Sequence, residues 1–77
     1  MNKERRKVLQ GIVDALDEQK VCIETVYEEE QEAYDNLPES IQYSERGETM
    51  SNNVSEMEDV ASELDDLIGR LQEIIDN

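Results

Sequence analysis

Two stretches of this chain repeat their apolar residues in alternating steps of three and four, and a single proline separates the stretches. Such a repeat places the apolar residues on one side of an α-helix, where they form a seam that packs against a neighbouring helix. The first seam comprises Leu9, Ile12, Leu16, Ile23, Val26, Ala33 and Leu37, with a flanking row of Val13, Lys20, Tyr27 and Tyr34. The second comprises Met50, Val54, Met57, Ala61, Leu64, Ile68, Leu71 and Ile75. The repeat therefore predicts an all-α chain.

The segment between the two stretches predicts where one helix ends and the next begins. Pro38 disfavours helical geometry at Leu37 and has no backbone N–H to donate. Ser44 is suited to cap a second helix, and Glu45 follows in its first turn, where a carboxylate complements the helix dipole. We predict a single domain over 1–77, with helix one at about 3–37, a turn at about 38–44 and helix two at about 45–76.

The two seams also predict how the helices pair. If the chain folds back near Ile41, facing residues have numbers that add to a constant near 83. The apolar seam residues from Leu9 to Ala33 then each meet an apolar residue of the second stretch, an agreement that neither helix guarantees alone. In the same alignment Glu30 faces Asn53, a pair able to form a hydrogen bond. The predicted fold is an antiparallel two-helix hairpin resembling a coiled coil.

Both predicted helices carry apolar residues beyond their seams. A two-stranded coiled coil needs only a narrow apolar stripe, whereas wider arcs suit helices that have two neighbours each. We therefore predict that two hairpins dimerise into a four-helix bundle. The residues assigned to this self-association are Val13, Tyr27, Val60, Leu67 and Ile74. The alternatives are an extended monomer with partly exposed apolar residues, or a different chain that covers them.

The residue types that usually carry catalysis or bind metals are scarce. The chain has no histidine and only one cysteine, Cys22, so neither a Cys/His zinc site nor an intrachain disulfide is possible. The 21 acidic residues do not follow the spacing of a calcium-binding loop and are interpreted as a solvated surface. We expect a non-enzymatic protein without a cofactor.

The net charge of −14 is distributed unevenly. Residues 1–20 carry five basic and four acidic side chains, and residues 21–77 carry two basic and seventeen acidic ones. A surface this negative repels phosphates, so nucleic acid is not expected as a direct ligand. No stretch approaches the ~20 apolar residues that cross a bilayer, and no apolar signal-peptide core is present. We expect a cytoplasmic protein without membrane contact.

The basic residues gather near the start of the chain, at Lys3, Arg5, Arg6 and Lys7. In the hairpin alignment this cluster lies beside Glu73, Asp76 and the C-terminal carboxylate, so it is expected to close the open end of the hairpin.

The turn concentrates the residues that are typical of protein interfaces, because an arginine and two tyrosines lie within one compact segment. The candidate partner-binding residues are Tyr34, Asp35, Leu37, Pro38, Glu39, Tyr43, Glu45 and Arg46. A structural interpretation is equally open at this point. In it the two tyrosines cap the end of the bundle, and Arg46 pairs with Asp35 or Glu39.

The turn also resembles a pattern found in small helical-hairpin proteins of bacteriophages and mobile elements. Their shared stretch reads Tyr-Asp-Asn-Leu/Met-Pro-Glu-x-hydrophobic-Gln-x-Ser-Glu-Arg. It is matched here by residues 34–39, 41–42 and 44–46, about a sixth of the chain. The resemblance implies a phage or prophage origin, and small phage proteins of this kind are often accessory factors or inhibitors of host enzymes. It implies no assigned activity.

These observations lead to one expected function and two alternatives. The expected function is a small acidic protein-binding module that pairs with itself and with a host protein, as a phage-type accessory protein or inhibitor. In the first alternative the carboxylates imitate the charge of DNA and occupy the basic cleft of a nucleic-acid-binding protein. In the second the chain is a structural coiled coil whose only partner is itself.

Overall fold

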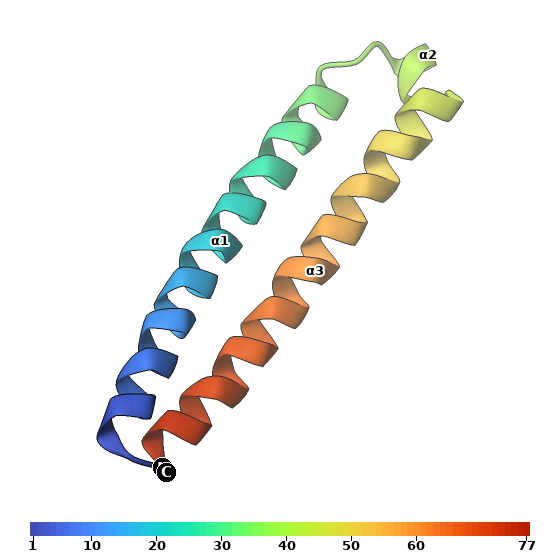
Figure 1. The fold of residues 1–77 in the computed structure, drawn as a ribbon. Helices are drawn as coiled ribbons and strands as arrows, with labels where there is room; N and C mark the ends of the chain where they lie inside the picture. Colours follow the sequence, from blue (N-terminus) through green and yellow to red (C-terminus); the bar gives the residue numbers. More distant parts are fainter.

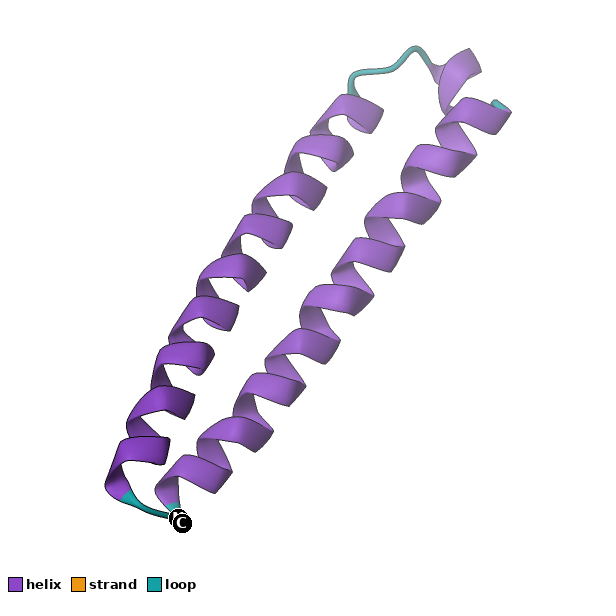
Figure 2. Ribbon diagram, in the orientation of Figure 1, coloured by secondary structure: helices purple, strands orange, loops and turns teal.

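The computed structural model describes residues 1–77, which form two long helices packed antiparallel (Figure 1). The elements are α1 (Lys3–Asp35), α2 (Glu39–Gln42) and α3 (Glu45–Asp76). The predicted all-α antiparallel hairpin is therefore confirmed, and the pairing of two hairpins stays a prediction. Helix occupies almost the whole chain, with loops confined to the turn and the two ends (Figure 2).

The hairpin is a thin rod. Its backbone measures 58 × 14 × 12 Å, and its radius of gyration is 17.4 Å. A compact domain of this length would have a radius of gyration of roughly 11–12 Å. Two helices side by side can bury only the seam between them, so much of the apolar surface of this chain stays at the surface of the rod.

Both long helices begin at a capping side chain. The side-chain oxygen of Asn2 accepts a hydrogen bond from the backbone N–H of Arg5 at 2.8 Å. Ser44, the residue predicted to cap the second helix, accepts one from the N–H of Gly47 at 3.4 Å. Each contact satisfies one of the N–H groups that the first turn of a helix leaves without a partner.

α1 ends at Asp35, two residues earlier than predicted, because the turn has its own structure. Pro38 starts the one-turn helix α2, a short element that the apolar repeat did not indicate. The side-chain amide of Gln42 in α2 reaches back to the end of α1. There it donates to the carbonyl oxygens of Tyr34 at 3.1 Å and Asp35 at 3.4 Å. These carbonyls lack partners within α1, so Gln42 fixes α2 against the helix that precedes it.

Three cross-helix polar contacts establish the alignment of α1 with α3. Arg6 Nη2 donates to the carbonyl oxygen of Asn77 at 2.5 Å, and Gln72 Nε2 donates to Gln10 Oε1 at 3.3 Å. Lys20 Nζ lies 2.9 Å from Asp65 Oδ1. The residue numbers of these pairs add to 83, 82 and 85, which agrees with the predicted constant near 83.

The α3 seam is buried or half-buried along its whole length, as predicted. α1 is rotated about its axis relative to the prediction. Its inner rows are Leu9, Leu16, Ile23, Glu30 and Leu37, together with Val13, Lys20, Tyr27 and Tyr34. The row Ile12, Gln19, Val26 and Ala33, predicted to belong to the seam, is exposed instead.

The rotation has a physical cause in the side chains that it buries. Turning Val13, Tyr27 and Tyr34 inward places more apolar surface against α3 than Ile12, Val26 and Ala33 would. Lys20 is tolerated in the same row because its stem lies along the seam while its ammonium group reaches Asp65. With Asn53 outside the inner row of α3, Glu30 and Asn53 form no hydrogen bond, contrary to the expected pairing.

Gly47 is required by a close approach between α2 and α3. It is buried, and a Cβ at this position would lie under 3.0 Å from the backbone carbonyl oxygens of Ile41 and Gln42. Gly69 and Gly11 are different, because a Cβ at either would meet nothing within 4 Å.

We predict opposite effects of alanine at two glycines. Gly47→Ala forces α2 away from α3 and should lower the free energy of unfolding by about 1–3 kcal/mol. Gly69→Ala, the matched control, should raise it by about 0.5–1 kcal/mol because alanine favours a helix. Urea unfolding followed by circular dichroism at equal protein concentrations measures both. A Gly47→Ala variant as stable as the wild type would show that α2 does not hold the turn.

Candidate functional site

One long side of the hairpin is apolar. Two shallow grooves, of about 330 and 270 Å³, lie along it, and ten of their twelve lining residues are hydrophobic. The first is lined by Leu16, Leu64, Leu67, Arg70, Leu71 and Ile74, and the second by Gln19, Cys22, Ile23, Val26, Met57 and Val60. Together they form a hydrophobic surface that belongs to both long helices.

Helix geometry explains why these residues share one side. Successive residues of an α-helix are rotated by about 100° around the helix axis. The residues that directly precede the buried Val13 and Ala61 therefore lie on the same flank of the seam. In an antiparallel pair, the corresponding flanks of the two helices face the same way. We call the surface formed by Ile12, Val26, Val60, Leu67 and Ile74 the apolar face. These five side chains are between 44% and 51% exposed, so a single hairpin leaves each about half uncovered.

The structure divides the predicted self-association residues into two groups. Val60, Leu67 and Ile74 lie on the apolar face, at the positions that the prediction requires. Val13 does not, because it is only 5% exposed and packs in the core of its own hairpin. Tyr27 is half-buried and lines the opposite, acidic side. Val13 and Tyr27 do not lie on the apolar face, because the rotation of α1 turns their row inward, and Ile12 and Val26 occupy this face instead. The role of all five residues in self-association stays a prediction.

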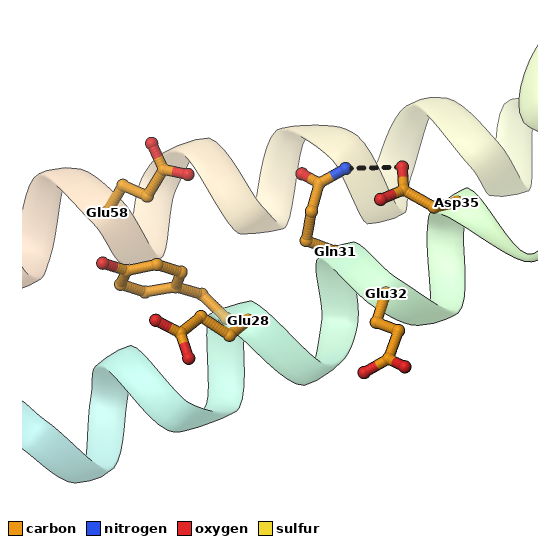
Figure 3. Close-up of a pocket in the computed structure, with 6 residues that line it drawn as sticks. Glu28, Gln31, Glu32, Asp35 and Glu58 are labelled. Carbon is orange, nitrogen blue, oxygen red and sulfur yellow. Dashed lines mark hydrogen bonds between the residues drawn. The ribbon is translucent and has the colours of Figure 1, made fainter.

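The opposite side of the hairpin is acidic. Two shallow depressions on this side are lined mainly by polar residues, and Tyr27 and Glu58 contribute to both. Figure 3 shows Glu28, Glu32 and Asp35 projecting from α1 and Glu58 from α3, with Gln31 donating to Asp35 at 2.9 Å. We call this surface the acidic face. The two faces give the rod one hydrophobic and one negative side.

Tyr27 and Lys20 have altered acidity on the acidic face. Desolvation raises the pKa of the Tyr27 phenol above its ordinary 10.0, and the negative charges of Glu24, Glu58 and Glu28 act in the same direction. The pKa of Lys20 is raised above 10.5, first by its hydrogen bond to Asp65 and then by neighbouring carboxylates, while desolvation opposes the rise. Tyr27 is therefore uncharged and Lys20 charged at neutral pH.

At the tip of the turn, Tyr43 and Arg46 are open to solvent. Tyr43 is 78% exposed, more than any other large hydrophobic residue. Arg46 is exposed and forms no salt bridge, so the expected pairing with Asp35 or Glu39 is not present. Tyr43 does not cap the end of the hairpin either. Both side chains are free to contact another molecule.

The other turn residues proposed for partner binding fall into two classes. Tyr34 and Leu37 are half-buried against the hairpin, whereas Asp35, Pro38, Glu39 and Glu45 are exposed. Much of the turn pattern has a role in folding, since Pro38 begins α2 and Ser44 caps α3. Gln42 and Gly47 belong with these structural residues. Neither role could be predicted from a local pattern, because Gln42 acts through the backbone at the end of α1 and Gly47 through the backbone of α2.

The basic cluster at the open end forms little of the expected closure. Arg6 contacts the backbone of Asn77, and its Nε is buried without a hydrogen-bond partner. Lys3, Arg5 and Lys7 are exposed and form no salt bridge with Glu73 or Asp76. Three positive side chains are therefore left unpaired, and of these Arg5 lies on the row of Ile12 at the edge of the apolar face.

No group of three or more Cys, Asp or Glu side chains is arranged to hold a metal ion. Neither long helix contains a stretch apolar enough to cross a membrane.

Comparison of the chain with known protein families, curated proteins and solved structures finds no match. The resemblance of the turn to phage hairpin proteins therefore stays an expectation.

We predict that the acidity of Tyr27 reports on the acidic face. In a Tyr34→Phe/Tyr43→Phe variant Tyr27 is the only tyrosine, and its ultraviolet titration should give a pKa above 10.0 that Glu58→Gln lowers. Protonated Tyr27 and Lys20 contribute to the free energy of unfolding. This contribution is complete below pH ~10 and is lost as the pH rises through their raised folded-state pKa values. A Tyr27 pKa at or below 10.0 would contradict the packing described.

Proposed function

We propose that this chain is a small, non-enzymatic protein-binding module that pairs with itself through the apolar face. The pair presents its acidic faces and its turn tips to a second, different protein. The resemblance of the turn to phage proteins favours a bacterial host protein as that second partner, with this chain as an accessory factor or inhibitor.

The observation that supports this proposal is the incomplete core. Only three hydrophobic residues, Val13, Val54 and Ala61, are buried in the single hairpin. A chain of 77 residues depends on nearly all its apolar surface for stability, because one small core supplies only a few kcal/mol. Covering the apolar face would complete the layers around Leu16, Ile23 and Leu64. Helices with two neighbours each are those of a four-helix bundle.

The turn tip is the favoured site for the second protein. Tyrosine and arginine are enriched among residues that dominate binding energy, and Tyr43 and Arg46 are exposed within four residues of each other. Tyr43 directly follows α2 and Arg46 lies in the first turn of α3, and the hydrogen bonds of Gln42 and Ser44 join α2 to both long helices, which gives the two side chains a fixed support. A rigid support lowers the entropy lost on binding.

We predict that self-association depends on the apolar face. Light scattering coupled to size exclusion should give the wild type twice the 8.9 kDa chain mass. Leu67→Glu should give a monomer with reduced helix content, since burial of an unpaired carboxylate is strongly unfavourable. Ser51→Glu adds the same charge to an exposed α3 position on the other flank and should leave the dimer intact. A wild type that is monomeric and fully helical at micromolar concentration would refute self-association.

The alternative of DNA mimicry is favoured by the distribution of carboxylates. Residues 28–56, which include the turn, carry nine acidic and one basic side chain, a net charge of −8. Glu28, Glu32 and Asp35 follow one another along α1 at steps of four and three, with Glu58 across the seam (Figure 3). A row of charges of this kind fits a basic cleft that normally holds a phosphate backbone.

We predict that Tyr43→Ala/Arg46→Ala weakens binding to the second protein by at least about 2 kcal/mol, roughly thirtyfold, with helicity unchanged. The measurement is capture from bacterial lysate on the immobilised chain, followed by titration of the captured protein. Val21→Ala, which changes an exposed apolar residue remote from the turn, is the control and should bind normally. Mimicry would instead leave the double variant active and make wild-type binding fall steeply between about 0.1 and 0.5 M salt.

A further inference from the structure

We propose that the second copy lies on the apolar face in the opposite direction, with a two-fold axis through the layer formed by Gln19 and Leu67. This inference rests on the proposed self-association and adds the orientation of the pair. It assigns a role to Gln19, the one polar residue at the centre of the apolar face.

The apolar face is symmetric about the layer of Gln19 and Leu67. One heptad from this layer in each direction, α1 places Ile12 and Val26, and α3 places Ile74 and Val60. A two-fold axis across the rod sets α1 on the partner's α1 and α3 on the partner's α3. Apolar residues then meet apolar residues, with Ile12 against the partner's Val26 and Ile74 against the partner's Val60. At the axis each Gln19 meets its own copy, and so does each Leu67.

The contacts of Gln19 decide between this pairing and the parallel one. If both turns lay at the same end, α1 would pack on the partner's α3 and each Gln19 would face the partner's Leu67. A buried amide without a hydrogen-bond partner is strongly unfavourable, and this pairing would create two. In the antiparallel pairing the two amides donate to each other's carbonyl oxygens. A single buried polar residue of this kind fixes the alignment of paired helices.

The charges beside the apolar face favour the same orientation. Its outer edges carry Glu29 on α1 and Glu56, Glu63 and Arg70 on α3, all exposed. Antiparallel pairing sets Arg70 beside the partner's Glu63 twice, on the edge where α3 packs on the partner's α3. Parallel pairing would set Glu29 beside the partner's Glu56, which is repulsive.

The ends of the rod show the same complementarity on a larger scale. Residues 1–11 and 67–77, at the open end, carry five basic and three acidic side chains, a net charge of +2. The turn end, residues 28–56, has a net charge of −8. Antiparallel pairing brings unlike ends together, and the unpaired Arg5, seven residues before Ile12, approaches the partner's carboxylates at the turn end.

The area available is sufficient for a stable dimer. The backbone outline of this side measures 58 × 14 Å, about 800 Å², which is the upper limit of the flat contact that one copy can offer. This is the area per partner of a standard protein interface.

Disulfide formation by the native Cys22 can report the orientation. In the antiparallel pair Cys22 lies next to the partner's Ala15, and in the parallel pair it lies next to the partner's Glu63. All three positions are exposed. Ala15 and Cys22 of one chain are seven residues apart on α1, about 10 Å, which exceeds the reach of a disulfide. Glu63 and Cys22 of one chain lie on opposite outer edges of the hairpin. Neither pair can close within a chain.

The experiment compares Ala15→Cys with Glu63→Cys, each keeping Cys22, under mild oxidation and non-reducing electrophoresis. We expect Ala15→Cys to give at least tenfold more covalent dimer than Glu63→Cys. More covalent dimer from Glu63→Cys would overturn the orientation. So would a failure of both variants to cross-link while light scattering still shows a dimer. A wild type that is monomeric in light scattering would overturn the proposed self-association as well, and this result is distinguishable from the other two.

Gln19→Leu gives a second readout. Removal of the amide should raise the thermal stability of the dimer. It should also bring the yields of covalent dimer from Ala15→Cys and Glu63→Cys closer together, because leucine fits either pairing. An unchanged ratio between the two cysteine variants in this background would show that Gln19 does not set the orientation.

Discussion

The packing of two inner rows of α1 against two of α3 is the constraint on which the rest of this structure depends. It sets which residue of one helix lies beside which residue of the other, as the contacts of Lys20 with Asp65 and Gln10 with Gln72 show. It also decides what is left outside. Because the seam takes one arc of each helix, the remaining apolar residues gather on one flank and the carboxylates on the other.

The separation into two faces explains how so negative a chain can still associate. Charges of one sign spread evenly over a thin rod would oppose any close contact between copies. Here the carboxylates of the acidic face surround Tyr27, while the apolar face carries few of them and has Arg5 on its own row. The same chain therefore offers a surface for burial and a separate surface for charge.

The sequence predicted the parts of this fold that depend on one helix or one local signal. The α3 seam, the stop before Pro38 and the cap at Ser44 all lie where the pattern indicates. The rotation of α1 was missed because three adjacent rows of this helix carry apolar residues, and the choice between them is made by packing against α3. The predicted alignment of α1 with α3 was still correct, since the predicted and observed rotations of α1 differ by only one residue in register.

The candidate site was predictable to a similar extent. Val60, Leu67 and Ile74 are exposed on the flank of α3, as their predicted role requires, because the α3 seam was correct, whereas Val13 and Tyr27 are turned inward because the α1 seam is rotated. The solvent exposure of Tyr43 and Arg46, and the hydrogen bonds of Gln42, depend on how α2 folds back on α1. Four residues of helix leave no periodic signal in a sequence.

The contact of α2 with Gly47 has a consequence for the order in which the chain folds. Closing a loop costs more entropy as the loop lengthens, so contacts around the turn form before those between Arg6 and Asn77, which are 71 residues apart. Each pair of seam residues that forms shortens the loop left for the next. The hairpin thus closes progressively from the turn, and its open end is the last part to become ordered and the first to fray.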